Sequence, residues 1–323
     1  MPRIRIDAPA KLNLHLNVGK KRPDGFHEIQ SLFLALAYGD TLFFEVNSEK
    51  PAFLTEIILD WQLPWGSQND LSPEKNIVNK AVSLFREHTG FDKELKIVLE
   101  KRIPMGGGLG GGSSDAAAAL LALKSLASPD ITVNDAVLLE MGASLGSDVP
   151  FFLQIALNKA PMAWVGGRGE LVRPFAEPKI QNLSFVLVNP GLPSDTGKAF
   201  RLLDELRGSD LQTLNPEPRT LTPFLSDSPR DWPFTNDFLS VFEAGSRQDH
   251  QDNLSFSECL EIITTLKKLG ADFSGLSGSG STCFGVFTSQ DKAIVARESL
   301  LLRWNFVIET FLLAFKTIQC YNI

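Results

Sequence analysis

Apolar and polar residues alternate along several stretches of the chain, and this period of two predicts β-strands. Residues 4–18, IRIDAPAKLNLHLNV, predict paired strand segments. Residues 34–47 predict a strand, a turn at Gly39-Asp40 and a second strand, because Gly and Asp favour turns. Further strands are expected at 94–103 before Pro104, in a hairpin around Gly166-Gly167, in the apolar run 185–191 and, as core or late strand, at 307–315.

Apolar residues spaced by three and four predict helices between these strands. The clearest covers 76–90, where Gly90 suits the C-terminal cap. Others are expected at 113–128, at 133–146 with Asn134 as a cap, and at 256–270. Residues 205–235 are rich in Pro, Ser and Asp without a clear period, which predicts a surface insertion or loop.

The mixture of hairpins and helices predicts an α+β fold rather than a doubly wound parallel sheet. A length of 323 residues allows two domains, expected over 1–165 and 166–323. Hydrophobic residues make up 43% and charged residues 21%, which is typical of a globular protein with a substantial core. No stretch reaches the roughly 18 apolar residues of a membrane span, so no membrane association is expected.

Charge and cysteine content narrow the class further. The 31 basic and 38 acidic residues give a formal charge of −7, which argues against a general nucleic-acid surface. A local basic site for a small anion remains compatible with this balance. The three cysteines stand far apart without a CxxC pair or nearby His, so neither a disulfide framework nor a zinc site is expected. A reducing, cytoplasmic location fits this pattern.

A run of glycine between a predicted strand and a predicted helix carries the chemistry. Residues 104–119 read PMGGGLGGGSSDAAAA, and six of the seven residues from Gly106 to Gly112 are glycine. Glycine lets backbone N–H groups approach a phosphate without a Cβ in the way, and the following helix adds a partial positive charge at its N-terminus. Ser113 and Ser114 are placed to cap that helix or donate hydroxyls. The run therefore predicts a phosphate-binding loop.

Other interpretations of the loop are weaker. Gly106, Gly108 and Gly111 satisfy G-x-G-x-x-G, but no strand ending in an acidic residue follows about 20 residues later, as a dinucleotide site needs. No Gly-Lys-Ser/Thr follows either, so the loop is not a Walker A motif. A flexible linker would not stand between a strong strand and a strong helix.

Three motifs together resemble the GHMP kinase superfamily. They are PAKLNLHLNVGKKRPDGFHEIQSLF near the N-terminus, the glycine loop PMGGGLGGGSSDAAAAL, and GLSGSGSTCFGVF near the C-terminus, in the order of that superfamily. Within it, APAKLNL…RPDGFHE…SLF resembles the diphosphocytidyl methylerythritol kinase family of the non-mevalonate isoprenoid pathway. The resemblance implies a two-domain fold, with an N-terminal domain like ribosomal protein S5 domain 2, a ferredoxin-like C-terminal domain and a cleft between them.

The resemblance also implies roles for single residues. Asp148 in GSDVPFF would take the proton from the attacking hydroxyl, and Lys11 would offset charge beside the transferred phosphoryl group. As lone residues they would be a helix or turn cap and a surface lysine. ATP would contact Pro104, Met105, Gly106, Gly107, Gly108, Leu109, Gly110, Gly111, Gly112, Ser113 and Ser114, with Lys101 and Asn76 bordering the adenine. Gly278, Ser279 and Gly280 would close over the phosphates or support the first loop, unless they form only a strand-entry turn.

Substrate positions follow from the same motifs. Asn13, Phe26, His27, Thr196 and Phe200 would bind the diphosphocytidyl substrate, with Phe26 and Phe200 on the two faces of cytosine and the backbone at His27 reading its edge. Phe26 stands where the family most often has tyrosine. The expected reaction is ATP-dependent phosphorylation of the substrate's 2-hydroxyl, with Mg²⁺ bound through the nucleotide. A monomer or weak homodimer is expected.

Alternatives remain at this point. Another small-molecule kinase of the superfamily, of the homoserine or mevalonate type, is disfavoured by RPDGFHE. A non-catalytic relative that senses a sugar or nucleotide is disfavoured because Lys11 and Asp148 are both present. A dinucleotide-dependent oxidoreductase rests only on the weak glycine match.

Overall fold

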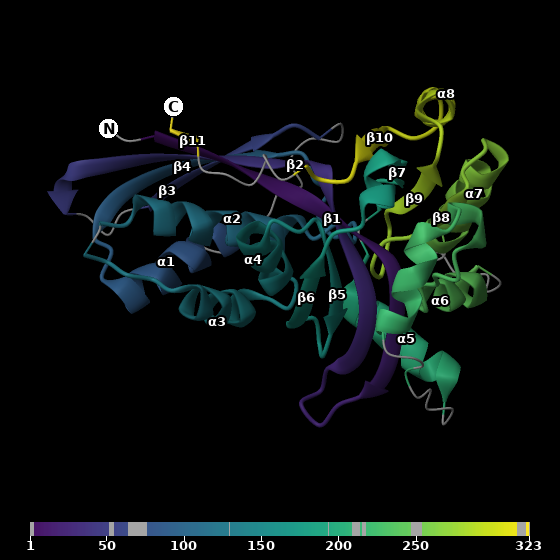
Figure 1. Cartoon of the computed structure of the whole chain (residues 1–323), viewed down its shortest axis with the longest axis horizontal. Helices are drawn as coiled ribbons and strands as arrows, with labels where there is room; N and C mark the ends of the chain where they lie inside the picture. The colour runs from purple at the N-terminus through teal and green to yellow at the C-terminus, as the bar shows by residue number, and fades with distance from the viewer. Residues whose placement is uncertain are drawn as a thin grey trace.

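The computed structural model describes residues 3–51, 55–63, 76–128, 130–192, 194–208, 214, 218–246, 254–314 and 321–322. Over these residues the chain forms two β-sheets, each with its own helices (Figure 1). Among the described helices, none combines the length and apolar character that crossing a bilayer requires.

The first sheet is built on two long neighbouring strands. Within the described ranges it has seven strands, with β11-β1-β2-β4-β3 side by side and a β5–β6 hairpin paired to β2. The helices α1 to α4 lie together along one side of this sheet (Figure 1). The elements are β1 (Arg3–Lys21), β2 (His27–Pro51), β3 (Thr55–Trp61), α1 (Ile77–Thr89), β4 (Lys93–Lys101), α2 (Gly111–Leu126), α3 (Asp135–Leu145), α4 (Val149–Asn158), β5 (Met162–Gly166), β6 (Leu171–Phe175) and β11 (Tyr321–Asn322).

The second sheet has the antiparallel order β10-β7-β9-β8 in the described residues. Its helices α7 and α8 lie on the outer side of the molecule (Figure 1). The elements are the 3₁₀ helix η2 (Pro178–Asn182), β7 (Ser184–Asn189), α5 (Thr196–Arg207), the 3₁₀ helices η3 (Pro218–Ser226) and η4 (Pro229–Asp231), α6 (Phe238–Gly245), α7 (Leu254–Lys268), β8 (Phe273–Leu276), β9 (Cys283–Phe287), α8 (Gln290–Leu301) and β10 (Phe306–Phe311).

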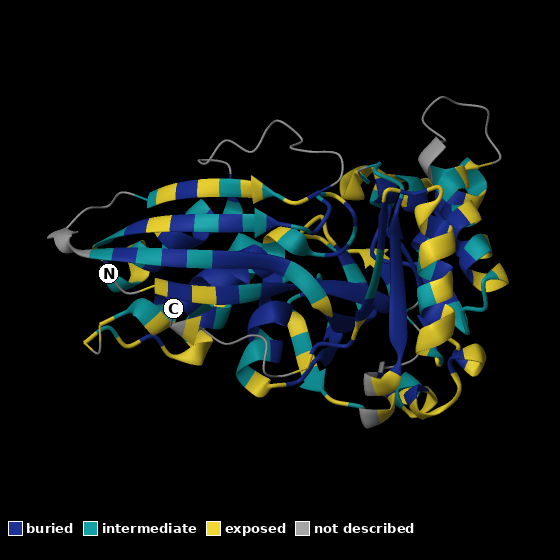
Figure 2. Ribbon diagram, turned by 90° about the horizontal axis from the view of Figure 1, so that it is seen from above, coloured by how far each residue is buried: buried dark blue, intermediate teal, exposed yellow. Residues whose placement is uncertain are grey.

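The middle of β1 and β2 is buried on both faces, which joins the two halves of the molecule. Leu16 and Phe33 belong to one hydrophobic cluster that includes residues of helices from both halves. Leu12 and Leu34 pack in a second cluster with Phe185, which belongs to the second sheet. Strands at this junction are buried along their length, whereas the outer helices present exposed residues to solvent (Figure 2). The glycine loop, between β4 and α2, lies at this junction.

Several sequence predictions agree with the structure. Helix α1 begins after Asn76, whose side chain accepts a hydrogen bond from the Val78 N–H, and ends at Gly90 in the left-handed region. Asn134 caps α3 through the Val137 N–H. The hairpin of β5 and β6 and the strand β10 also form where the pattern predicts them.

The predicted turn at Gly39-Asp40 is wrong, because β2 runs through it as a single strand. Gly39 is required for close approach to β1, since a Cβ there would lie 2.3 Å from the Ala8 carbonyl oxygen. Residues 4–18 likewise belong to one strand, β1, with β-bulges at Pro9/Lys11 and Asn13/His15 rather than to paired segments.

Residues 205–235 are only partly a surface loop. Residues 209–213 and 215–217 lie outside the described residues. Helix α5 continues to Arg207, and Leu225, Trp232 and Phe234 are buried in the second cluster. Their burial comes from partners distant in sequence, which a local absence of periodicity does not reveal.

The expected domain boundary between residues 165 and 166 stays a prediction. It falls inside the β5–β6 hairpin, whose strand β6 pairs with β5 in the first sheet. We propose that the boundary lies between Phe175 and Ser184, where the chain passes from the first sheet to the second. Strand β11 returns from the C-terminal part of the chain to pair with β1.

Candidate active site

A cavity of about 930 Å³ lies where the two halves meet. The N-terminal motif, the glycine loop, the start of α4, the start of α5 and the turn between β8 and β9 all contribute to its lining. All the predicted site residues except Ser114 and Gly280 line it. Segments far apart in sequence therefore converge on one site.

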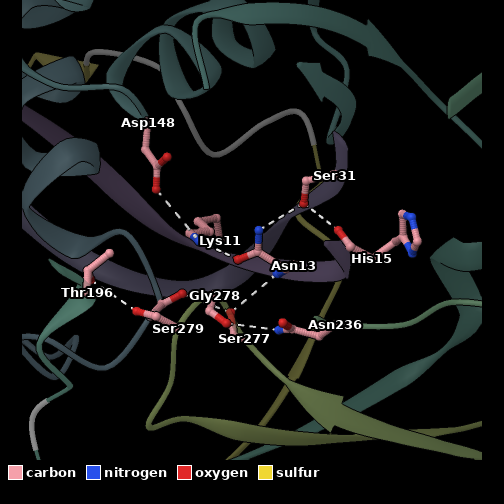
Figure 3. A network of polar contacts seen from close by, with 11 residues as sticks. Lys11, Asn13, His15, Ser31, Asp148, Thr196, Asn236, Ser277, Gly278 and Ser279 are labelled. Carbon is pink, nitrogen blue, oxygen red and sulfur yellow. Dashed lines mark hydrogen bonds and ion pairs between the residues drawn. The ribbon is translucent and has the colours of Figure 1, made fainter. Parts of the chain in front are cut away.

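Lys11 and Asp148 meet on one wall of this cavity (Figure 3). The Lys11 Nζ lies 3.7 Å from Asp148 Oδ2, and it also donates a hydrogen bond to Asn13 Oδ1. Asp148 occupies the N-cap position of α4, but its side chain makes no capping hydrogen bond. Pro150 in the first turn helps to start this helix without a cap, because its fixed φ suits that position. The Asp148 carboxylate therefore faces Lys11 instead of its own helix.

The pKa of Lys11 depends on its burial and on its neighbours. The ammonium group is buried and lies 4.7 Å from the centroid of the Phe33 ring. Burial lowers the pKa of Lys11 from its ordinary value, while the charge of Asp148 opposes this effect. Asn13 is fixed in turn by donating through Nδ2 to Ser31 Oγ at 3.0 Å. The result is a positioned cation beside a partly exposed carboxylate.

In the glycine loop, the carbonyl groups are hydrogen-bonded to other described residues, whereas the amide groups are not. Five consecutive carbonyls, of residues 106–110, accept bonds from Ser194 N (2.9 Å), Thr282 N (3.1 Å), Ser277 Oγ (2.8 Å), Lys11 N (2.9 Å) and Ser114 N (2.9 Å) respectively. In the described part of the chain, the amides of residues 106–113 donate no hydrogen bond to another protein group. These N–H groups belong to residues that line the cavity, at the N-terminus of α2. Such a row of free donors is typical of an anion site.

The glycines of the loop do not all have the same function. At Gly108, where φ is +77°, a Cβ would lie 2.1 Å from the Ser277 carbonyl oxygen, so this glycine permits packing against the β8–β9 turn. At Gly112 a Cβ would find its nearest neighbour, Ile77 Cγ2, at 3.8 Å. Only the second position combines open space with an unstrained backbone. At Gly108 the absence of a side chain is therefore needed for packing within the protein, whereas at Gly112 it leaves open space.

The β8–β9 turn supports the loop and the N-terminal motif together. Ser277 Oγ bonds the Gly108 carbonyl and accepts from the Asn13 N–H at 3.3 Å. Asn236 Nδ2 donates to the Leu276 and Gly278 carbonyls, which fixes the turn from the other side (Figure 3). Thr196 Oγ1 lies 3.0 Å from Ser279 Oγ. The turn therefore does more than introduce a strand.

Lys101 is held by two carboxylates in a cluster of buried charges. Its ammonium group donates to Asp40 Oδ2 and, at 2.7 Å, to Asp115 Oδ2. Burial opposes its charge, but Asp115 and Asp40 outweigh that effect and raise the pKa of Lys101. Burial raises the pKa of Asp115 well above its ordinary value, and Asp115 Oδ1 has no partner among the described residues. Asp40 also accepts from the Arg102 and Ile103 N–H groups.

The other residues predicted to bind the nucleotide, Asn76, Ser113 and Ser114, lie near the starts of two helices. Asn76 is buried at the start of α1 and uses Oδ1 as a helix cap. Neither Ser113 nor Ser114 caps α2, because the helix already begins at Gly111 with Gly110 as its N-cap. Ser114 is buried and does not line the cavity, so its predicted contact with ATP is not supported by its position. The adenine contacts of Lys101 and Asn76 stay predictions.

Aromatic residues also line the cavity. Phe26 is 47% exposed, and the Arg168 guanidinium lies 5.0 Å from its ring centroid. His27 stacks on Phe200 with centroids 4.8 Å apart, and its Nε2 lies 2.9 Å from Asp204 Oδ1. The Phe200 face that meets His27 is open to a base only when this stack separates. The predicted Phe26–Phe200 sandwich stays a prediction.

Sequence reasoning missed three residues at this site: Asp40, Asp115 as an ion-pair partner, and Arg168. One feature of the sequence could have indicated Asp40, because it is an acidic residue inside an otherwise apolar strand pattern. Arg168 had none, because a basic residue in a hairpin turn is ordinarily a solvated side chain.

Two family models match separate parts of the chain. The family model for the GHMP kinases N terminal domain matches residues 76–154, and that for GHMP kinases C terminal matches residues 239–304. The 4-diphosphocytidyl-2-C-methyl-D-erythritol kinase of Thermodesulfovibrio yellowstonii is 34% identical over 93% of this chain and 95% of its own length. The chain belongs to the diphosphocytidyl methylerythritol kinase family of GHMP kinases.

A solved structure of this kinase family agrees. The crystal structure of a 4-(cytidine 5'-diphospho)-2C-methyl-D-erythritol kinase has a TM-score of 0.72 and 33% identity, covering 95% of this chain and 98% of that one. Homoserine kinase from Cytophaga hutchinsonii has a TM-score of 0.62 but only 17% identity, over 99% of this chain and 97% of its own, so this likeness shows the fold alone. The two-domain α+β fold expected for the kinase family is confirmed.

Proposed function

We propose that this protein transfers the γ-phosphoryl group of ATP to the 2-hydroxyl of 4-diphosphocytidyl-2-C-methyl-D-erythritol. The observation that carries the proposal is the meeting of Lys11 and Asp148, 3.7 Å apart, beside the free amides of the glycine loop in one cavity. Identity of 34% to a curated kinase of this family supports the substrate.

Each part of the cavity has a role in this reaction. The amides of residues 106–113 would hold the ATP phosphates, because free N–H donors at a helix N-terminus favour anions. Asp148 would accept the proton of the attacking hydroxyl, and Lys11 would offset the negative charge that the transferred phosphoryl group carries. Phosphoryl transfer depends mainly on such positioning and charge stabilisation.

Mg²⁺ would reach the site with the nucleotide. The described residues contain no group of three or more His, Cys, Asp or Glu side chains that could hold a metal ion. Asp115 and Asp204 line the cavity but are already engaged by Lys101 and His27. This donor set suits a Mg²⁺ ion that keeps waters and phosphate oxygens as ligands, which is the usual arrangement for this ion. Its contribution would be to neutralise phosphate charge.

A cytoplasmic location and a monomeric or weakly dimeric state belong to the same proposal. The buried free thiols of Cys259 and Cys283 support a reducing environment, while Cys320 lies outside the described residues. Sedimentation across a concentration series would test the oligomeric state.

A coupled ATP-consumption assay tests the function. The diphosphocytidyl substrate should sustain turnover, whereas homoserine and mevalonate should not exceed the rate without substrate. The matched control is Asp148→Asn, which keeps the size of the side chain and removes its charge. Equal rates with the cytidyl substrate and with no substrate would overturn the proposal.

A further inference from the structure

Five cations line the cavity, and they fall into two groups. Lys11 and Lys101 are ion-paired with carboxylates. Lys21, Arg168 and Arg201 form no ion pair with any residue that the structure describes. In a chain with a formal charge of −7, three unpaired cations around one cavity make a local positive region that favours an anion.

Arg168 is the most constrained of these three cations. It is half-buried, whereas Lys21 and Arg201 are exposed. Its guanidinium lies 5.0 Å from the Phe26 ring centroid, where a cation attracts the face of the ring. The turn that carries it is tied to β2, because the Ile29 N–H donates to the Gly167 carbonyl at 2.7 Å.

The same turn also lies against the loop that carries Asp148. A Cβ at Gly169 would lie 3.1 Å from the carbonyl oxygen of Ser147, the residue before Asp148. Arg168 therefore lies in a turn that contacts both β2 and the residue before Asp148. Phe26 and the loop of Asp148 are therefore both neighbours of the turn that carries Arg168.

We propose that Arg168 binds the diphosphate of the cytidyl substrate and is a specificity-determining residue for it. This inference rests on the proposed function. In the substrate, the diphosphate joins the cytidine to the methylerythritol that carries the reacting hydroxyl. If Phe26 contacts the base and Asp148 the hydroxyl, the diphosphate lies between them, beside Arg168. A guanidinium matches phosphate oxygens through paired N–H donors, which a lysine ammonium does not reproduce.

Calorimetric binding of CDP and of cytidine separates this role from a purely structural one. The ATP site is filled with a non-hydrolysable ATP analogue, so that CDP reports on the substrate end. Arg168→Gln should weaken CDP binding about tenfold, the scale of one charge-assisted hydrogen bond at a half-exposed site. Cytidine binding should change less than about twofold, since cytidine has no phosphate for Arg168 to bind.

Arg173→Gln is the matched control, because Arg173 is exposed on β6 of the same hairpin and does not line the cavity. It should leave both affinities unchanged. Arg168→Lys should recover only part of the CDP affinity, because it restores the charge without the paired donors. Equal weakening of CDP and cytidine by Arg168→Gln would show that Arg168 acts only by supporting the Phe26 ring, and the inference would be overturned.

Turnover measurements distinguish a failure of the Arg168 inference from a failure of the proposed function. Arg168→Gln should raise KM for the cytidyl substrate about tenfold, leave KM for ATP unchanged and reduce the salt dependence of the substrate KM. A wild-type protein that does not phosphorylate the cytidyl substrate would overturn the proposed function. The comparison of CDP with cytidine uses no turnover and would still decide the role of Arg168.

Discussion

Replacing Lys101 by methionine removes the only cation from a buried cluster of described residues that also contains Asp40 and Asp115. The side chains of the three are 4%, 0% and 4% exposed, so solvent does not screen the loss. Removing one partner of a buried ion pair commonly costs about 3–5 kcal/mol, because the remaining charge is left uncompensated. With two carboxylates remaining, we expect the free energy of unfolding to fall by an amount at the upper end of this range.

Thermal unfolding measures this effect. A loss of that size corresponds to a decrease in Tm of roughly 10 °C for a chain of this length. The matched control is Lys96→Met on the same strand β4, where the lysine is exposed. It should change Tm by no more than about 2 °C, because exposed charges contribute little.

The pH dependence of the Lys101→Met variant has a definite sign. Burial already raises the pKa of Asp115, and loss of the lysine removes the main influence that lowers it. A carboxyl group whose pKa is raised on folding stabilises the fold at low pH, and this contribution disappears as the pH rises through the raised value. The variant should therefore be closest to wild type at acidic pH and should fall further below it as the pH rises.

A second substitution tests the charge directly. Adding Asp115→Asn to Lys101→Met removes one of the two uncompensated carboxyls and should restore part of the lost stability. Asp115→Asn alone should destabilise the fold less than Lys101→Met, because Lys101 keeps Asp40 as its counter-ion. If Lys101→Met were no less stable than Lys96→Met, the reasoning about this cluster would be refuted.

Three further predictions concern activity. Asp148→Asn should lower kcat by about 10²–10⁴-fold, as loss of a general base commonly does, with ATP affinity retained in calorimetry; a near-normal kcat would contradict its role. Gly112→Ala should leave Tm unchanged, because its Cβ meets nothing within 3.8 Å, but should weaken ATP binding; unchanged affinity would argue against a phosphate cradle here. Phe26→Ala should lower kcat/KM for the cytidyl substrate by about 10–100-fold without affecting KM for ATP, whereas Phe26→Tyr should be tolerated. A selective effect on KM for ATP would contradict the assignment of Phe26 to the cytosine pocket.

Local sequence was sufficient where an element depends on its own residues. Helix α1 could be predicted because Asn76 and Gly90 cap it and its apolar face repeats at helical spacing. The glycine loop could be predicted because a glycine run between a strand and a helix has few uses other than anion binding. The pairing of Lys11 with Asp148 came from motif resemblance, since nothing local connects residues 137 positions apart.

Tertiary contacts decided the rest. Gly39-Asp40 has the composition of a turn, yet it lies within β2, because the Asp40 carboxylate finds Lys101 and two backbone amides beside it. From the sequence, Arg168 would be expected to be a solvated turn residue, yet the fold places its guanidinium over the Phe26 ring. In both cases the energy comes from partners distant in sequence. Local preferences of about 1 kcal/mol are overridden when folding brings a buried charge to its counter-ion or a cation to a ring.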